Sequence, residues 1–352
     1  MGEPTGRGPD TGRGPDTGGG TVPADGHVLG VDSGGSGLRI AVARADDPAA
    51  RPLATYASNE PVRIGPDGID AGHLLSQLLP AAEELRREVG AVRFTAGCVG
   101  AAGMATLGDE LRARLPAELA TAFGVRRLAL AADAVTAYAG ALGQRPGAVV
   151  AAGTGMIALG TDLTGEGGWR RADGWGHLLG DCGSGAWIGR AGLEAAMRAY
   201  DGRPGGSAAL LARAQAMFGP VNGLPGALYP RPDRPAVLAS FAPEVGRCAA
   251  DDAVADGILR AAAGHIADAA AAVCPPGAGS AVACTGGLFG MGEPLLAPLR
   301  TALAERLPDA RPTAAAGSPL DGALTIAAAL AGDRLTLPVD PKLLQITRPA
   351  PG

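Results

Sequence analysis

Two stretches of the chain place a glycine-rich turn between two apolar runs. The first covers residues 28–42 and reads VLGV, the turn DSGGSG, and then LRIAV, in which apolar residues recur at every second position. The second covers residues 148–159 and reads AVVAA, the turn GTG, and then MIAL. A two-residue period is that of a strand and not of a helix. The pattern predicts two β-hairpins, and not the strand–turn–helix units of a dinucleotide fold or a P-loop.

The remaining apolar patterns predict a mixture of helices and buried strands. A long helix is the clearest of them, with acidic residues at its start and an apolar stripe along its length. We expect helices at 74–85 (interrupted by proline), 135–142, 186–188, 210–217, 251–274 and 319–330, and strands at 94–99, 128–132 and 281–284. This alternation of strands and helices is that of an α/β protein.

The chain divides by composition into four parts. Residues 1–26 are rich in glycine, proline and charge and repeat the hexapeptide TGRGPD, so they are expected to be a disordered extension without an assignable role. The turn residues of QRPG at 144–147 indicate a boundary between two lobes. We therefore expect an N-terminal lobe over 27–145, a C-terminal lobe over 146–335 and an irregular tail over 336–352.

Composition excludes several partners and compartments. The 352 residues are 47% hydrophobic, and the formal net charge is −5, so neither nucleic acid nor an anionic membrane is an expected partner. No apolar run reaches the roughly 18 residues of a membrane span, and no signal peptide is apparent. The five cysteines are scattered without a C-x-x-C pair, which predicts a reduced, cytoplasmic protein without a disulfide framework or structural zinc.

The absence of certain residues also excludes classes of enzyme. Lys342, in the proline-flanked tail, is the only lysine, which excludes a G-x-x-x-x-G-K-[ST] P-loop and the strand lysine of a protein kinase. It also argues against Schiff-base chemistry. Neither G-x-S-x-G nor H-E-x-x-H occurs, which argues against a serine hydrolase and a zinc protease of these types.

Glycine turns of this kind suit phosphate. Their backbone N–H groups converge on one point, and an acid at the start of the turn, here Asp32, could hold hydrated Mg²⁺. One such turn is a weak signal, but a second copy and a third glycine site at the end of a strand strengthen it. The candidate nucleotide-binding residues are Gly34, Gly35, Ser36, Gly37, Gly153, Thr154, Gly155, Gly286 and Gly287, the last two beside an adenosine.

The order of these features resembles the actin/Hsp70/sugar-kinase superfamily. Within it, the chain is most similar to the branch of N-acetylglucosamine kinases and BadF/BadG/BcrA/BcrD-type ATPases. The resemblance covers 27–335, and its segments are DSGGSG at 32–37, GAAG at 100–103, ADA at 132–134, GTG at 153–155 and GWGHLLGDCGSGAWIG at 174–189. It implies a two-lobed actin-like ATPase fold, ribonuclease H-like and α/β, with ATP and sugar in the cleft between the lobes. It also implies a last helix that returns to the N-terminal lobe, and a homodimer.

The resemblance assigns roles to particular residues. Asp133 is implied to be the catalytic base, which takes the proton of the attacking sugar hydroxyl. Local sequence allows equally that Asp133 only caps a helix. Asp181 is implied to bind sugar hydroxyls, where local sequence allows a cap of the helix near Ala186. The sugar site would also contain Asn59, Thr154, Gly155 and Gly176.

Two residues depart from the pattern of similar kinases. Cys182 stands where they usually carry glutamate, and it can supply neither that charge nor its hydrogen bonds. Met156 stands where a serine is common, so one hydroxyl near the phosphates is missing. For His177 we expect a structural hydrogen bond. Three tryptophans gather in this part of the sequence, and core packing is expected for them more than sugar stacking: Trp169, Trp175 and Trp187.

The function implied is an ATP- and Mg²⁺-dependent amino-sugar kinase, with N-acetylglucosamine phosphorylated at its 6-hydroxyl. Glucosamine and N-acetylmuramic acid are alternative substrates. Other classes remain open: an iron–sulfur ATPase that activates a dehydratase, a repressor-type sugar sensor, and a sugar binder without catalysis. Such activators carry paired cysteines, whereas Cys182 is the only cysteine near a glycine loop.

Overall fold

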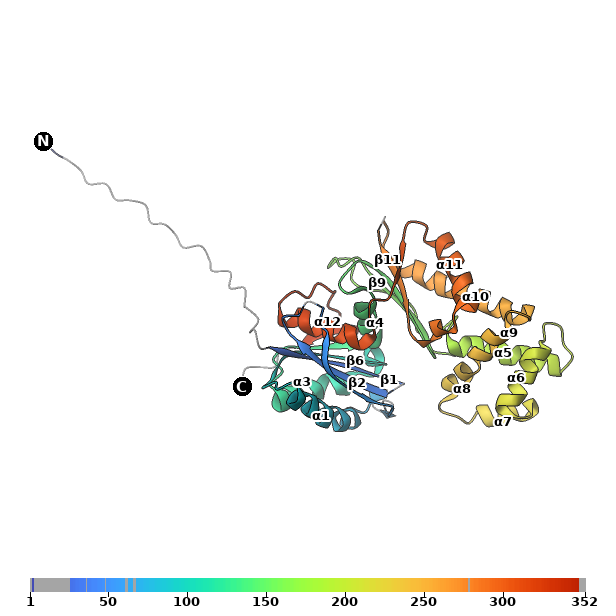
Figure 1. Ribbon diagram of the computed structural model, residues 1–352, viewed down its shortest axis with the longest axis horizontal. Helices are drawn as coiled ribbons and strands as arrows, with labels where there is room; N and C mark the ends of the chain where they lie inside the picture. Colours follow the sequence, from blue (N-terminus) through green and yellow to red (C-terminus); the bar gives the residue numbers. More distant parts are fainter. Residues whose placement is uncertain are drawn as a thin grey trace.

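The computed structural model describes Gly2 and residues 26–347, apart from residues 36, 48, 61–62, 66–67 and 278. The predicted extension over 1–26 therefore lies almost wholly outside the described residues, as does Ser36. The structure contains two larger β-sheets, one of six strands and one of five, with helices packed against them (Figure 1).

The first sheet has the order β13-β7-β6-β1-β2-β3. The central strands β1, β6 and β7 run parallel, while β2, β3 and β13 are antiparallel to their neighbours. The strands span His27–Gly34 (β1), Gly37–Arg44 (β2), Pro52–Ser58 (β3), Phe94–Ala101 (β6), Leu128–Ala132 (β7) and Leu344–Thr347 (β13). The predicted glycine hairpin at 28–42 is thus confirmed, because β1 and β2 pair from His27 with Arg44 to Gly34 with Gly37.

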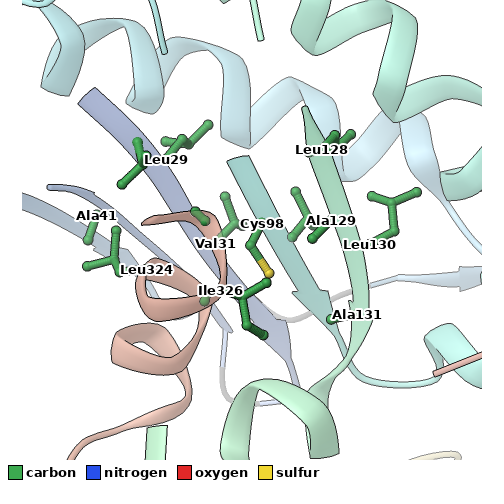
Figure 2. Close-up of a cluster of buried hydrophobic side chains, with 14 of the residues drawn as sticks. Leu29, Val31, Ala41, Cys98, Leu128, Ala129, Leu130, Ala131, Leu324 and Ile326 are labelled. Carbon is green, nitrogen blue, oxygen red and sulfur yellow. The ribbon is translucent and has the colours of Figure 1, made fainter. Parts of the chain in front are cut away.

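Helices cover both faces of this sheet. In Figure 1, α1 (Ala71–Glu88) and α3 (Asp109–Phe123) lie below it, and α4 (Asp133–Leu142) and α12 (Pro319–Ala331) lie above it. The inner strands read as continuous apolar runs because both faces of the sheet are buried: in Figure 2, Cys98 of β6 points toward α12, which contributes Leu324 and Ile326, whereas Leu29 of β1 and Leu128 of β7 lie on the opposite face. A short helix, α2 (Met104–Leu107), and the β4–β5 ribbon (Ile64–Gly65 and Gly68–Ile69) lie beside α3.

The second sheet has the order β10-β9-β8-β11-β12. Its strands span Gly147–Ala152 (β8), Met156–Thr161 (β9), Arg170–Asp173 (β10), Ala281–Thr285 (β11) and Arg311–Ala314 (β12). The second glycine hairpin is confirmed by the antiparallel pairing of β8 with β9. The long helix α10 (Ala253–Val273) packs on this sheet and on α11 (Glu293–Arg306), with fully buried Leu259 and Ile266 on its core face.

A group of helices lies beyond the second sheet, at the right of Figure 1. Helix α5 is its centre and contacts α6, α8, α9 and α10. Its members span Gly185–Tyr200 (α5), Ala208–Phe218 (α6), Leu224–Leu228 (α7), Arg234–Ser240 (α8) and Ala242–Cys248 (α9), with 3₁₀ turns at Val221–Gly223 and Gly287–Met291. Within the residues that the structure describes, no helix has the length and apolar character needed to span a membrane.

Helices α4 and α12 cross where the chain passes between the two sheets. α4 follows β7 of the first sheet and precedes β8 of the second, and α12 follows β12 and packs on β1 and β6. Their backbones approach closely at glycines. A Cβ atom on Gly322 would lie 1.9 Å from the carbonyl oxygen of Thr136, and one on Gly140 would lie 2.0 Å from that of Ser318. Any side chain at these positions would force the helices apart.

The structure differs from the sequence prediction in three places. The tail over 336–352 is not irregular throughout, because β13 pairs with β7 and buries Leu344 completely. The helix predicted as interrupted is continuous through Pro80. Helices α3 and α11 were not predicted, and each carries an internal proline, Pro116 and Pro298, among many charged residues. In all three cases local composition argued for a break, and packing against neighbouring elements outweighed it.

Candidate functional site

The first glycine turn joins β1 to β2 and carries an acid at its start. The guanidinium of Arg39, opposite Asp32 on β2, lies 3.6 Å from the Asp32 carboxylate. Burial raises the pKa of Asp32, and the nearby charge of Arg39 partly opposes that effect. Gly37 has a φ of +115°, and a Cβ atom there would lie 2.0 Å from the carbonyl oxygen of Ser58. The turn therefore requires glycine at position 37. It brings Asn59, whose Cα lies near the same point, beside the residues predicted to bind phosphate.

Asp133 is the first residue of α4, directly after β7. In the parallel part of the first sheet, Asp32 on β1 pairs with Gly100 on β6, and Gly100 pairs with Ala131 on β7. The carboxyl ends of these strands therefore meet at one edge, where ligands of open α/β sheets bind. Ala132 occupies the N-cap position of α4, so the interpretation of Asp133 as the capping residue is not supported.

The environment of Asp133 favours a proton acceptor. Its Oδ1 accepts a hydrogen bond of 2.9 Å from the N–H of Ala134. Burial, and after it the charge of Asp32, raise the pKa of Asp133 to about 6, while the Ala134 hydrogen bond lowers it. A carboxyl with a pKa near 6 is a stronger base than an ordinary aspartate and is still ionised at neutral pH, which suits general-base chemistry.

The second glycine turn is held by the first residues of α5. The carbonyl of Gly153 accepts the N–H of Gly185, and the carbonyl of Thr154 accepts the N–H of Ala186. Gly286, which has a φ of +108°, follows the parallel neighbour β11, and a Cβ atom on it would lie 2.2 Å from the carbonyl oxygen of Ala152. The turn and the late glycine pair that begins at Gly286 therefore lie together at the carboxyl ends of β8 and β11.

Asp181 lies against this second turn. Its Oδ1 accepts the N–H of Gly176 at 3.2 Å, and a Cβ atom on Gly155 would lie 2.7 Å from its Oδ2. Burial raises the pKa of Asp181, and hydrogen bonds from backbone N–H groups of Gly176 and Met156 lower it. Ser184, not Asp181, caps α5 by accepting the N–H of Trp187. The helix-cap interpretation of Asp181 is therefore wrong.

Asp173, the last residue of β10, was missed at the sequence level. Its Oδ1 accepts the N–H of Asp181 at 2.6 Å, and its Oδ2 accepts the N–H of Cys182 at 2.9 Å. Asp173 and Asp181 both have positive φ values, +59° and +53°. Such backbone conformations in residues other than glycine concentrate at functional sites. The sequence did contain a signal for it, because Asp173 stands directly before the Gly-Trp-Gly that opens the family motif at 174–189.

The three tryptophans do not form one cluster, and only two are packed inside. Trp169 donates to the carbonyl of Pro338 and lies edge-to-face with Tyr138, and Trp187 lies edge-to-face with His265. Trp175 is 66% exposed, so the prediction of core packing is wrong for it. Its ring lies 4.4 Å from the guanidinium carbon of Arg171, which also donates to the carbonyls of Asp173 and Gly174. Hydrogen bonds to backbone carbonyls thus fix the Arg171 guanidinium, on which the Trp175 ring packs.

The structural hydrogen bond expected for His177 does not appear among the described residues. The charge of the His177 ring instead contributes a small lowering of the pKa of Asp181, which burial mainly raises. The thiol of Cys182 is partly accessible, and burial, followed by the charge of Asp173, raises its pKa. An inert thiol is therefore favoured over a reactive one.

The donor set at the first turn fits magnesium that is bound together with phosphate. Across the described part of the chain, no three His, Cys, Asp or Glu residues gather closely enough to hold a metal ion by themselves. Mg²⁺ commonly keeps several waters and takes only one or two carboxylates besides the phosphates of a nucleotide. Asp32, which lies close to the first turn, supplies such a carboxylate.

The predicted site residues therefore fall into two groups. One lies at the edge of the first sheet and the other at the edge of the second. The first comprises Asp32, Gly34, Gly37, Asn59 and Asp133, and the second comprises Gly153, Thr154, Gly155, Gly176, Asp181 and Gly286. Gly35 follows β1, and Gly287 begins the 3₁₀ turn after β11. α4 leads from the first group toward β8, which ends at the second.

Comparison with known proteins supports this arrangement. The sequence model of the BadF/BadG/BcrA/BcrD ATPase family matches residues 29–327. An N-acetylmuramic acid/N-acetylglucosamine kinase of Clostridium acetobutylicum is 28% identical over 183 residues, which are 50% of this chain and 55% of that protein. The chain thus matches about half the length of this relative.

Solved structures match over nearly their whole length. A protein from Chromobacterium violaceum, proposed to be an N-acetylglucosamine kinase, is 30% identical with a TM-score of 0.62, over 86% of this chain and 99% of that one. A ROK family glucokinase from Streptomyces griseus, solved with glucose and AMPPNP, is 20% identical with a TM-score of 0.51, over 88% and 98% of the two chains. The predicted sugar-kinase fold, a two-lobed actin-like ATPase, is confirmed by these matches.

Proposed function

Because the chain belongs to the BadF/BadG/BcrA/BcrD ATPase family, we propose that it is an ATP-dependent amino-sugar kinase that forms a hexosamine 6-phosphate. N-acetylglucosamine is the first choice of substrate, and glucosamine and N-acetylmuramic acid are the alternatives. The observation that carries the proposal is the pair Asp32 and Asp133, a buried carboxyl of raised pKa beside a second acid and a glycine turn. The names of the Clostridium and Chromobacterium proteins point to the same class of substrate.

The proposed reaction uses Asp133 to orient and deprotonate the sugar hydroxyl. Phosphoryl transfer passes through a loose transition state, so the protein acts mainly by positioning and by neutralising charge. The hydroxyl of the sugar would donate its hydrogen bond to the Asp133 carboxylate and attack the γ-phosphorus of ATP. Its proton then passes to Asp133 as the bond to the leaving ADP oxygen breaks. The raised pKa makes Asp133 a better acceptor for that proton.

The glycine turns would hold the nucleotide. Backbone N–H groups of the turns after β1 and β8 suit the phosphates, and Gly286 and Gly287 suit an adenosine lying against the backbone. Asp32 would hold Mg²⁺ through its water shell, and bound Mg²⁺ would neutralise charge on the phosphates. On the sugar side, Asp181 and Asn59 would bind hydroxyl or acyl oxygens, together with Thr154, Gly155 and Gly176. Closure of the two lobes would exclude water from the reaction.

The test is turnover of ATP to ADP with Mg²⁺ across a panel of hexoses, amino sugars and N-acetylated sugars, with product mapping by NMR. Turnover that depends on one amino sugar and yields its 6-phosphate supports the proposal. Sugar-independent ATP hydrolysis by a protein that is purified with bound iron would instead indicate an activator of a dehydratase. Sugar binding without turnover would indicate a sensor or a non-catalytic binder. We also propose a homodimer, to be measured by light scattering.

A further inference from the structure

The loop that carries Asp181 is closed by a second carboxylate. Residues 174–183 leave the end of β10 and return to the start of α5. Asp173, at the origin of the loop, accepts two successive backbone N–H groups at its far end, those of Asp181 at 2.6 Å and Cys182 at 2.9 Å. Charged acceptors make hydrogen bonds about twice as strong as neutral ones. The loop is therefore held at its two ends by one side chain.

This contact acts on the position of the Asp181 carboxylate. Asp181 adopts a φ of +53°, a conformation that is uncommon for any residue with a side chain and needs support from its surroundings. The bond from its N–H to Asp173 supplies that support, and it directs the Asp181 side chain toward Gly155 and the N–H of Gly176. The space around the Asp173 carboxylate is narrow, since a Cβ atom on Gly180 would lie 2.4 Å from Oδ1 of Asp173.

Asp173 also places a carboxylate close to Cys182, the position at which similar kinases usually carry glutamate. A thiol at position 182 supplies no negative charge, but the Asp173 carboxylate lies against the backbone N–H of the same residue. The end of this loop therefore still has a carboxylate beside it, but that carboxylate belongs to Asp173 and not to residue 182. Because Asp173 binds the backbone and not a ligand, its action on a substrate would pass through Asp181.

We propose that Asp173 is a positioning residue of the sugar site, which fixes the Asp181 carboxylate for binding to sugar hydroxyls by holding the N–H groups of Asp181 and Cys182. The inference rests on the proposed function. It assigns sugar affinity to a residue that does not touch the sugar. The glycine turn after β1 is built on other elements, and of the second turn only Gly155 borders Asp181, so the nucleotide site should depend on Asp173 much less than the sugar site does.

Two variants separate the carboxylate from the backbone conformation. Asp173→Gly removes the carboxylate but suits a φ of +59° better than aspartate does. Asp173→Asn keeps one acceptor and turns an amide donor toward an N–H group. A control for the general loss of such a contact is Asp252→Ala, because Oδ1 of Asp252 accepts the N–H groups of Val254 and Ala255, each at 2.9 Å, at the start of α10.

For both Asp173 variants we expect the KM for the sugar to rise about tenfold or more, equivalent to about 1.4 kcal/mol. The KM for ATP and kcat should stay within about twofold. Asp252→Ala should lower Tm and leave the KM for the sugar unchanged. A wild-type KM for the sugar in Asp173→Gly, or an equal rise in the KM for ATP, would overturn the proposal.

Hydrogen exchange of the amides of Asp181 and Cys182 tests the contact without reference to activity. We expect at least tenfold faster exchange at both amides in Asp173→Gly, while the start of α10 stays protected. Unchanged exchange would show that Asp173 does not hold the loop. If exchange is faster but the protein phosphorylates no sugar, the hydrogen bonds to Asp173 are supported. The role of Asp173 in sugar binding is then overturned together with the proposed function.

Discussion

Asp133 is buried beside the carboxylate of Asp32, and the burial and then the charge of Asp32 raise the pKa of Asp133 to about 6. The two residues come from different strands, β1 and the end of β7, with β6 between them. The negative charge of one carboxylate disfavours ionisation of a carboxyl near it. One is therefore suited to accept a proton, and the other, which also contacts Arg39, is suited to remain charged.

Removal of the proposed base should abolish sugar phosphorylation. Asp133→Asn keeps the size of the side chain and an acceptor for the N–H of Ala134, but it cannot take a proton. We expect kcat to fall by about 10²–10⁴, measured as ADP release at saturating sugar and ATP. An active Asp133→Asn enzyme would show that Asp133 is not the base.

The pH dependence of the reaction should report the same carboxyl. Because the proposed base must be ionised, kcat/KM for the sugar should fall about tenfold per pH unit below about pH 6. Initial rates between pH 4.5 and 9 in buffers of constant ionic strength provide the profile. A flat profile down to pH 4.5 would contradict the assignment.

The same pKa makes Asp133 a source of instability near neutral pH. The unfolded chain releases this proton near the ordinary value of 3.8 and the folded chain near 6, so the folded state binds more protons between these values. The free energy of unfolding of the wild type therefore decreases as pH rises through this window. Asp133→Asn lacks the titration and should be more stable than the wild type at pH 8, by about 3 kcal/mol. Urea unfolding at pH 8 and pH 4 measures the difference, which should nearly vanish at pH 4.

A methyl group at Gly155 should weaken sugar binding. Its Cβ would lie 2.7 Å from Oδ2 of Asp181, so the carboxylate must move. We expect Gly155→Ala to raise the KM for the sugar by about tenfold, since small misplacements in a site have large effects. Gly165→Ala is the matched control, because a Cβ there meets nothing within 4 Å. Equal KM values for the two variants would argue against Asp181 as a sugar ligand.

The Mg²⁺ requirement should depend on Asp32. Asp32→Asn removes the negative charge at the start of the first turn, so a higher Mg²⁺ concentration should be needed for half-maximal turnover, by about tenfold or one pKd unit, close to 1.4 kcal/mol. Asp46→Asn, which affects an exposed ion pair with Arg44, should leave that concentration unchanged. Titrations of Mg²⁺ at fixed ATP measure this concentration for both variants. An unchanged value for Asp32→Asn would contradict the assignment of Mg²⁺ to Asp32.

The crossing of α4 and α12 should tolerate no added side chain. In Gly322→Ala the new methyl would lie 1.9 Å from the carbonyl oxygen of Thr136 and 2.5 Å from the nitrogen of Gly140, both backbone atoms. We expect a loss of about 3 kcal/mol or more in the free energy of unfolding. Gly257→Ala, at an exposed position of α10 with nothing within 4 Å, should instead gain about 0.5–1 kcal/mol. Chemical unfolding of both variants tests the contrast.

Much of the fold was open to prediction because its signals are local. Both glycine hairpins, the buried strands at 94–99 and 128–132 and the long helix α10 follow from the spacing of apolar residues. Helices α3 and α11 were missed because internal prolines and charge hide their apolar stripes. Strand β13 was missed because four residues at a sheet edge carry no signal without their partner β7.

The sequence alone determined the types and order of the candidate site residues, since glycine turns and strand-end acids are set by local backbone requirements. Only the tertiary structure decided their neighbours. It placed Asp32 near enough to Asp133 to change its pKa, exposed Trp175 where core packing was expected, and brought Asp173 to the N–H groups of Asp181 and Cys182. The physical reason is that charge interactions, burial and hydrogen bonds depend on distances in space. Strand pairing and the path of a loop set those distances, and neither can be read from the spacing of residues along a chain.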